Sequence, residues 1–204
     1  MLLSYFFPLD LAAAAREFKR AVELDPGSSD ALQEQSRSAE TFARFGEALD
    51  LARAAVARDP LNAWAYETTG RAELTLDQLA EAEASGRKAL ELAPGSAVLH
   101  YELGSVLLAR NQPAAALTEI EREPSPIFYH LGRTRAFYAL GRTTEADREF
   151  ATLQQEHGDG WAFQIAEVYA EQHNPEQAFA WLDRAYRQQD SGLVELRFSR
   201  RCAL

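Results

Sequence analysis

The chain has 204 residues, 47% of them hydrophobic and 25% charged, a composition typical of a soluble globular protein. Its net charge of −10 and the absence of a basic stripe argue against nucleic-acid binding by this segment. No apolar run approaches the roughly 20 residues of a membrane helix, and the single cysteine, Cys202, excludes an internal disulfide or a Cys-based metal site.

A repeat dominates the first half of the chain. Pro26, Pro60 and Pro94 follow one another at intervals of 34 residues, and each closes an Ala-rich amphipathic stretch. A fixed period of about 34 residues is typical of stacked helix pairs. The sequence therefore predicts an all-α protein, a right-handed α-solenoid with a C-terminal cap.

In chain order, the predicted array begins with a truncated unit, which consists of the helix at about residues 9–24 and the residues before it. Five helix-pair units follow, and a segment after the last of them is expected to cover its open hydrophobic end. We predict one domain over residues 1–204, divided into 1–27 (truncated unit), 29–61, 63–95, 97–126, 127–158 and 159–190 (helix pairs), and 191–204 (cap and tail).

The residues at the helix contacts resemble the tetratricopeptide repeat (TPR), whose first helix carries Leu-Gly and whose second carries Ala-x3-Phe-x2-Ala-x4-Pro. The chain has Leu103-Gly104 in one unit and Ala146 with Phe150 in another. The closing run from Trp161 to Leu196 resembles the end of TPR arrays in bacterial multidomain regulators, fused there to winged-helix, adenylate cyclase, kinase or TolB-like segments. This resemblance implies a cytoplasmic, bacterial protein.

Catalytic or cofactor chemistry has no sequence signature here. The four histidines are spread over three units, and none has a histidine four residues away to complete a helical zinc site. The chain also lacks a Gly-rich phosphate loop and a nucleophile elbow. We therefore expect no enzyme activity, no metal and no cofactor.

The resemblance instead implies a concave groove that binds a protein or peptide and is lined by the first helix of each unit. Chaperone-binding TPRs clamp a terminal carboxylate with Lys and Asn, and that clamp is absent. We expect Arg71 and Arg135 to be exposed in the groove near Trp64 and Tyr138, where they suit an acidic or aromatic peptide and can be removed with little loss of stability. The predicted groove residues are Gln33, Arg37, Glu40, Trp64, Glu67, Arg71, Tyr101, Ser105, Leu108, Phe128, Arg135, Tyr138, Phe163 and Glu167.

Two alternatives remain at this point. The apolar start of the chain, with Leu2, Leu3, Phe6 and Phe7, could form a homodimer and make the chain a homo-oligomerisation module. The chain could also be a regulatory segment of a cyclase or kinase whose catalytic domain is encoded outside it. The cap residues Leu193, Val194, Leu196 and Phe198 are expected to cover the last repeat.

Overall fold

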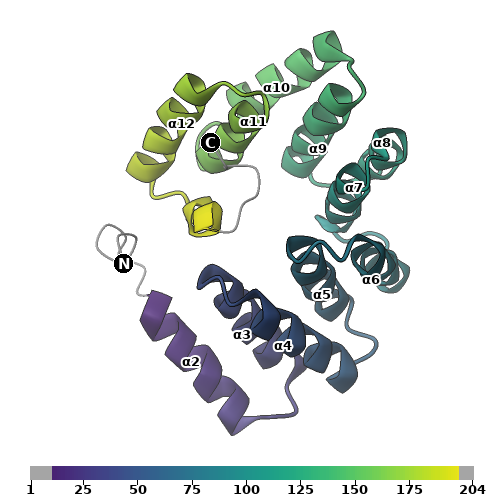
Figure 1. The fold of residues 1–204 in the computed structure, drawn as a ribbon, viewed down its shortest axis with the longest axis vertical. Helices are drawn as coiled ribbons and strands as arrows, with labels where there is room; N and C mark the ends of the chain where they lie inside the picture. Colours follow the sequence, from purple (N-terminus) through teal and green to yellow (C-terminus); the bar gives the residue numbers. More distant parts are fainter. Residues whose placement is uncertain (1–10, 198–204) are drawn as a thin grey trace. The chain divides into compact units, whose positions relative to one another are not determined.

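The computed structural model describes residues 11–197. The predictions about the apolar start, Phe198 and Cys202 lie outside these residues. The described chain is all-α, with consecutive helices packed as antiparallel pairs (Figure 1). It forms two compact units, Met1–Leu99 and His100–Leu204, with the boundary at the first residues of α7.

Within residues 11–99, the first unit consists of α2 followed by two helix pairs. α3 packs on α4 and α5 packs on α6, while α2 packs on α3, and α4 packs on α5. The first helices of the two pairs, α3 and α5, are also in direct contact. The helices are α2 (Leu11–Leu24), α3 (Ser29–Thr41), α4 (Phe45–Arg58), α5 (Ala63–Thr75) and α6 (Leu79–Leu92).

The second unit contains three helix pairs and a closing 3-10 helix, η1, which packs on α11 and α12. Pro126 begins α9, whereas the sequence predicted that it closes the preceding unit. Proline suits the first position of a helix because its missing N–H has no partner there. The elements are α7 (Leu99–Ala109), α8 (Pro113–Ile120), α9 (Pro126–Ala139), α10 (Thr143–His157), α11 (Ala162–Glu171), α12 (Pro175–Gln188) and η1 (Ser191–Arg197).

The repeated prolines mark helix ends as the sequence predicts. α2, α4 and α6 each end two residues before Pro26, Pro60 and Pro94 respectively. Side-chain caps mark the starts of three helices, and Ser28 accepts a hydrogen bond from the Ala31 N–H at the start of α3. The Asn62 side chain accepts hydrogen bonds from the Trp64 and Ala65 backbone N–H groups at the start of α5, and Asn174 caps α12.

The turn inside each of the five helix pairs has the same geometry. A single residue adopts the left-handed conformation, with φ between 55° and 71°, and the next residue donates its N–H to a carbonyl five residues earlier. This arrangement is a Schellman motif, which satisfies the last carbonyls of the first helix. Only one of these residues is a glycine; they are Ala43, Asp77, Asn111, Gly141 and His173.

Small residues allow the paired helices to approach closely. In α4, Ala48, Ala52 and Ala55 are completely buried. A Cβ atom added to Gly104 would lie 2.5 Å from Cγ1 of Ile120, which confirms that this glycine sits where α7 and α8 touch. The same isoleucine also packs against Gly132 of α9.

Larger side chains fill the core of the second unit. Phe150 of α10 packs against Tyr169 of α11, with ring centroids 4.9 Å apart. The core residues of this cluster are Tyr101, Ile127, Leu131, Phe150, Leu153, Ile165 and Val168. Leu193 of η1 is also buried.

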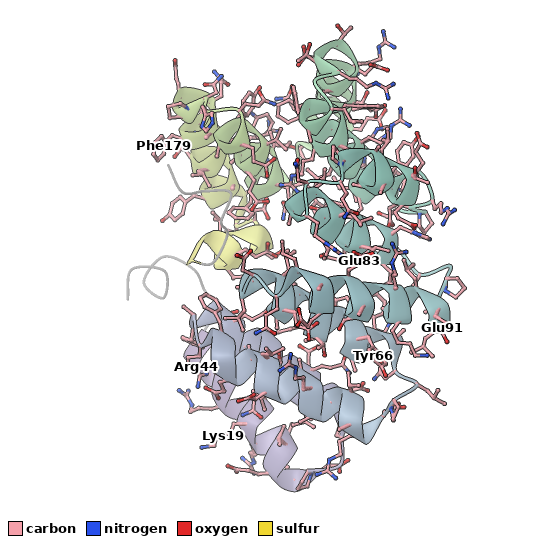
Figure 2. All side chains as sticks on the ribbon, turned by 45° about the vertical axis from the view of Figure 1, so that its right-hand side comes forward. Lys19, Arg44, Tyr66, Glu83, Glu91 and Phe179 are labelled. Atoms are coloured by element: carbon pink, nitrogen blue, oxygen red, sulfur yellow. The ribbon has the colours of Figure 1, made fainter. Side chains whose placement is uncertain are left out.

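Charged side chains lie on the outside of the first unit, as Figure 2 shows for Lys19 of α2, Glu91 of α6 and Arg44 in the turn before α4. Within residues 11–197, none of the helices combines the length and the hydrophobicity needed to cross a membrane.

Candidate functional site

The predicted groove residues fall on the first helices of the pairs. We call the residues of the first unit the α3–α5 face and those of the second unit the α7–α9–α11 face. The α3–α5 face comprises Gln33, Arg37, Glu40, Trp64, Glu67 and Arg71. The α7–α9–α11 face comprises Tyr101, Ser105, Leu108, Phe128, Arg135, Tyr138, Phe163 and Glu167.

Two crossed ion pairs join the helices of the α3–α5 face. Nη2 of Arg37 on α3 lies 3.0 Å from Oε2 of Glu67 on α5. In the opposite direction, Nη2 of Arg71 on α5 lies 2.8 Å from Oε2 of Glu40 on α3. Each helix therefore supplies one cation and one anion, and the four residues form what we call the α3–α5 quartet.

Burial in this quartet is asymmetric. The side chains of Glu67 and Glu40 are 4% and 3% exposed, whereas those of Arg37 and Arg71 are 37% and 28% exposed. The two carboxylates are thus buried, whereas the arginine side chains paired with them are partly exposed, although Nε of both arginines and Nη2 of Arg71 are buried. A buried carboxylate that pairs with a partly exposed arginine restricts the conformations of the arginine side chain. The arginine is therefore already ordered before a partner binds.

Burial also perturbs Glu40. Desolvation raises the pKa of this carboxyl above its ordinary value, and Glu67 raises it further, while Arg71 and Arg37 act in the opposite direction. Among the described residues, no hydrogen-bond donor reaches its buried Oε1 atom. The ionised form of Glu40 is therefore incompletely compensated in the folded protein.

An exposed aromatic side chain stands on the same face of α5 as Glu67 and Arg71. Trp64 is 42% exposed, and neighbouring Leu61, just before the helix, is exposed as well. Gln33 has a different environment, because it is buried and its Nε2 donates to Ser29 and Asp30. We therefore assign Gln33 to the packing of the face, and Trp64 to its accessible surface.

In the second unit, Arg135 is an internal residue, which corrects the expectation that it is exposed. Its side chain is only 4% exposed. It donates to the hydroxyl of Tyr101 on α7, and its Nη2 lies 3.0 Å from Oε2 of Glu167 on α11. Its Nε also lies 3.1 Å from Oε1 of Glu171. One guanidinium thus connects the first helices of three consecutive pairs.

This environment shifts the pKa of Arg135. Burial acts to lower the pKa, but Glu171, Tyr101 and Glu167 raise it, and the net shift is upward. The arginine therefore remains charged inside the protein. The expectation that this residue can be removed with little loss of stability assumed an exposed ion pair, and the burial of Arg135 contradicts that assumption.

Other residues of the α7–α9–α11 face are also largely internal. Phe163 is completely buried, and Ser105 is buried as well. Phe128 is half-buried between two aromatic rings. Its ring centroid lies 5.1 Å from that of Tyr101 and 5.4 Å from that of Trp161. Packing therefore accounts for most of these side chains, and only Phe128, Leu108 and Tyr138 keep partial exposure.

Tyr138 does not join Arg135 in a polar cluster. Its hydroxyl donates to Oδ1 of Asp147 on α10 at 2.6 Å. Burial raises the pKa of Tyr138, and the hydrogen bond to Asp147 adds to the increase. The phenol therefore remains neutral and acts as a donor to the neighbouring helix.

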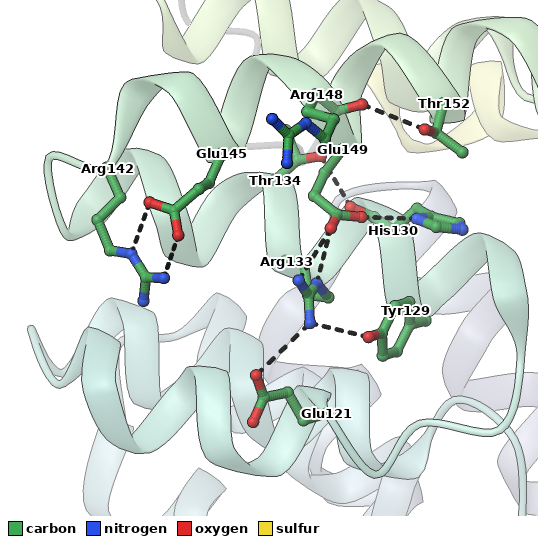
Figure 3. Close-up of polar contacts among 10 residues, drawn as sticks. All are labelled: Glu121, Tyr129, His130, Arg133, Thr134, Arg142, Glu145, Arg148, Glu149 and Thr152. Carbon is green, nitrogen blue, oxygen red and sulfur yellow. Dashed lines mark hydrogen bonds and ion pairs between the residues drawn. The ribbon is translucent and has the colours of Figure 1, made fainter.

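The sequence analysis missed a polar cluster on α9 and α10, shown in Figure 3. Nη2 of Arg133 lies 2.9 Å from Oε1 of Glu149, and its Nη1 donates to the Tyr129 hydroxyl at 2.8 Å. Nδ1 of His130 lies 2.7 Å from the second oxygen of Glu149. Arg133 also reaches Glu121, 3.5 Å away at the end of α8. These contacts tie α9 to both neighbouring helices.

A sequence signal for this cluster exists. His100 and Glu119 form a pair across α7 and α8 that matches the His130–Glu149 pair across α9 and α10. In both cases the histidine and the glutamate are 19 residues apart. The repeated spacing indicates a structural contact between the two helices of a pair. Among the residues that the structure describes, no three His, Cys, Asp or Glu side chains are grouped to hold a metal ion.

Comparison with known proteins agrees with this geometry. Residues 33–97, which run from within α3 to beyond the end of α6, match the family model described as tetratricopeptide repeat. No curated protein matches the sequence. This part of the chain is therefore similar to tetratricopeptide repeats, and the described helices have the fold of TPR proteins.

Several solved TPR structures share this fold. YrrB, a TPR protein with an unusual peptide-binding site, is 24% identical with a TM-score of 0.56, over 90% of this chain and 98% of its own. A thermophilic TPR protein from Thermus thermophilus, TTC0263, is 19% identical with a TM-score of 0.68, over 84% and 90%. PilF from Pseudomonas aeruginosa is 20% identical with a TM-score of 0.63, over 96% and 92%. At these identities, the similarity concerns the fold.

Proposed function

We propose that this protein is a non-catalytic interaction scaffold that binds a peptide or helix of a partner protein on its α3–α5 face. TPR arrays in general mediate contacts with proteins and peptides, and the fold neighbour YrrB has a peptide-binding site. The resemblance of the closing segment further suggests a cytoplasmic role within a bacterial signalling or transcriptional regulator.

The proposal rests on two arginines that are ordered by buried carboxylates and on one exposed tryptophan. Arg37 and Arg71 are each held by a buried carboxylate, and Trp64 is exposed on the same helix as Arg71. Arg and Trp are enriched among the residues that dominate binding energy at protein interfaces. Side chains that are already ordered lose less entropy when a partner binds.

The test is partner capture by the full chain and by a neutral variant of the quartet. The variant carries Arg37→Gln, Glu40→Gln, Glu67→Gln and Arg71→Gln, so no buried charge is left without its partner. The control is the double change Glu83→Gln, Arg87→Gln, which removes a partly exposed ion pair of α6 with a distance of 2.8 Å. We expect the same proteins to be captured by the wild type and the control, and to be lost from the quartet variant.

Trp64→Ala provides a second measurement on the same face. Because this side chain is 42% exposed, its removal should leave thermal stability nearly unchanged while it weakens capture. If the folded quartet variant and the Trp64 variant both capture the wild-type set of proteins, the α3–α5 face is not the binding surface.

Self-association is a second candidate function, and one observation favours it. In α2, Ala14 is exposed and Ala21 is half-buried, whereas the corresponding Ala48 and Ala55 of α4 are completely buried against α3. The matching face of α2 is thus incompletely covered. Light scattering across a range of protein concentrations tests this candidate, and Ala14→Glu should shift a dimer toward the monomer.

A further inference from the structure

We infer that α12 carries a contact surface for a second copy of this chain, on which the α12 helices of two copies pack antiparallel about a two-fold axis. The contact is formed by what we call the α12 stripe, which comprises Phe179, Leu182 and Tyr186. This stripe belongs to the second unit. It is separate from the α3–α5 face and from α2, which belong to the first unit.

The α12 stripe is apolar and open to solvent. Phe179 and Tyr186 are 59% and 44% exposed, although both are large aromatic side chains. Leu182, which lies between them in the sequence, is half-buried. Spacings of three and four residues place the three side chains on one side of the helix. Figure 2 shows Phe179 on the outside of α12. Aromatic residues are enriched at protein interfaces, so the stripe has the composition of a contact surface.

The earlier helix pairs show what covers the position of Phe179. In α4 and α8, the residue after the first buried alanine is Leu49 and Leu117 respectively, and both leucines are buried. Both helices pack on the first helix of the next pair, α5 and α9. In α12 the corresponding residue is Phe179, and the described chain continues with η1 rather than with another helix pair. This position is therefore suited to contact with a further helix that runs antiparallel to its own.

The charges beside the stripe fit an antiparallel copy of the same helix. Glu176 lies at the start of α12 and Arg187 near its end, and helical periodicity places both on the same flank of the stripe. In an antiparallel pair, Glu176 of each copy meets Arg187 of the other. Phe179 of each copy likewise meets Tyr186 of the other. The midpoint of positions 176 and 187 is 181.5 and that of 179 and 186 is 182.5, so one axis serves both pairings. An isologous contact requires this self-complementarity.

The residue of this flank closest to the axis is Asp183, where like charges of the two copies would meet. This charge is compensated within its own helix, because Nη2 of Arg187 lies 2.7 Å from Oδ2 of Asp183. The Arg187 side chain is 70% exposed, and a guanidinium has five N–H donors. Arg187 can therefore keep this contact and also reach Glu176 of the other copy. The antiparallel arrangement thus brings opposite charges together without an uncompensated like charge at its centre.

Sedimentation equilibrium of the full chain, from about 1 µM to about 1 mM, tests the contact. We expect a reversible monomer–dimer equilibrium. Phe179→Asp should weaken the dimer about tenfold or more, because it places a charge in the apolar contact of both copies. Trp64→Asp is the matched control, since it makes the same kind of change at an exposed aromatic residue of the first unit and should leave the dimer unchanged. Circular dichroism checks folding, and Tyr186→Asp provides the same measurement if Phe179→Asp does not fold.

Cross-linking and a charge swap test the two-fold geometry. All cross-linking variants also carry Cys202→Ser. Copies with Glu176→Cys and copies with Arg187→Cys should form a disulfide only when the two are mixed. In Glu176→Cys alone, the two thiols would lie roughly 15–20 Å apart along the helices, at a rise of about 1.5 Å per residue. Glu176→Arg should weaken the dimer, and adding Arg187→Glu should recover part of the loss, because each copy then carries both changes.

Four results would overturn the inference. A chain that remains monomeric at the highest concentration lacks this contact. A dimer that survives Phe179→Asp but is disrupted by Ala14→Glu uses α2 instead. Species larger than a dimer would indicate head-to-tail association. A disulfide formed by Glu176→Cys alone would indicate parallel helices. None of these results changes the test of the α3–α5 face, which is the capture of a partner protein.

Discussion

Replacing Arg135 with methionine should strongly destabilise the second unit, although methionine fills much of the space of the arginine side chain. The change removes the cation next to Glu167, whose side chain is 4% exposed, and leaves that carboxylate inside the protein without its ionic partner. Removing one member of a buried ion pair costs about 3–5 kcal/mol. Glu171 is 29% exposed and can turn to water, so it adds little to this loss.

Urea unfolding followed by circular dichroism measures the effect. With a slope of about 2 kcal/mol per M, the expected loss lowers the midpoint by roughly 1.5–2.5 M. Arg122→Met is the matched control, because Arg122 is 60% exposed and 3.5 Å from Glu119 in the same unit. An exposed pair of this kind contributes about 0–1 kcal/mol, so the control should stay close to the wild type.

The double variant Arg135→Met, Glu167→Met distinguishes a lost ion pair from lost packing. Replacing both members of a buried pair by apolar residues is often neutral or stabilising, so the double variant should recover most of the stability lost in the single variant. A loss of unfolding free energy below about 1 kcal/mol in the single variant would refute the reasoning. Arg135, which is 4% exposed and joins three helices, would then contribute no more than a surface residue. A double variant as unstable as the single one would attribute the effect to packing.

The remaining predictions concern packing, a turn and one acid. Gly104→Leu should cost about 1–3 kcal/mol in urea unfolding, because even a Cβ would lie 2.5 Å from Cγ1 of Ile120, and Ile120→Ala should relieve part of the loss. Phe150→Ala should cost about 3–5 kcal/mol, since the buried ring fills the contact between α10 and α11; an unchanged midpoint would contradict this. Ala43→Gly should raise the melting temperature with a gain of up to about 1 kcal/mol, because Ala43 has a φ of 58°. Burial raises the pKa of Glu40, so the folded state keeps the carboxyl proton at pH values at which the unfolded chain has lost it. Stability should therefore fall as pH rises from about 4.5 through the folded-state pKa. Glu40→Gln should flatten this dependence in denaturation curves measured between pH 4 and 7 and be neutral or stabilising at pH 7; a less stable variant at pH 7 would show that the pairing with Arg71 outweighs the cost of burial.

The sequence by itself determined the helix pairs and their small-residue contacts. The ends of α2, α4 and α6 follow from the repeated prolines, because a proline restricts the residue before it and cannot continue a helix. Gly104 was placed at a helix contact through its resemblance to the Leu-Gly position of the TPR motif, and the close approach of Ile120 confirms that placement. The left-handed turn residues were missed where they are Ala43, Asp77, Asn111 or His173, because only a glycine signals this conformation clearly in a sequence.

The tertiary structure alone decided which polar side chains are exposed. Arg71 and Arg135 occupy similar positions on their helices, yet the first is partly exposed and the second is buried. The difference arises because Arg135 meets Tyr101, Glu167 and Glu171 from two other helices, at separations of 32 to 36 residues. Contacts at such distances depend on how the repeats stack, and helical periodicity fixes only the side of one helix on which a residue lies. The crossed pairs of the α3–α5 face have the same origin, since each buried carboxylate pairs with an arginine from the other repeat.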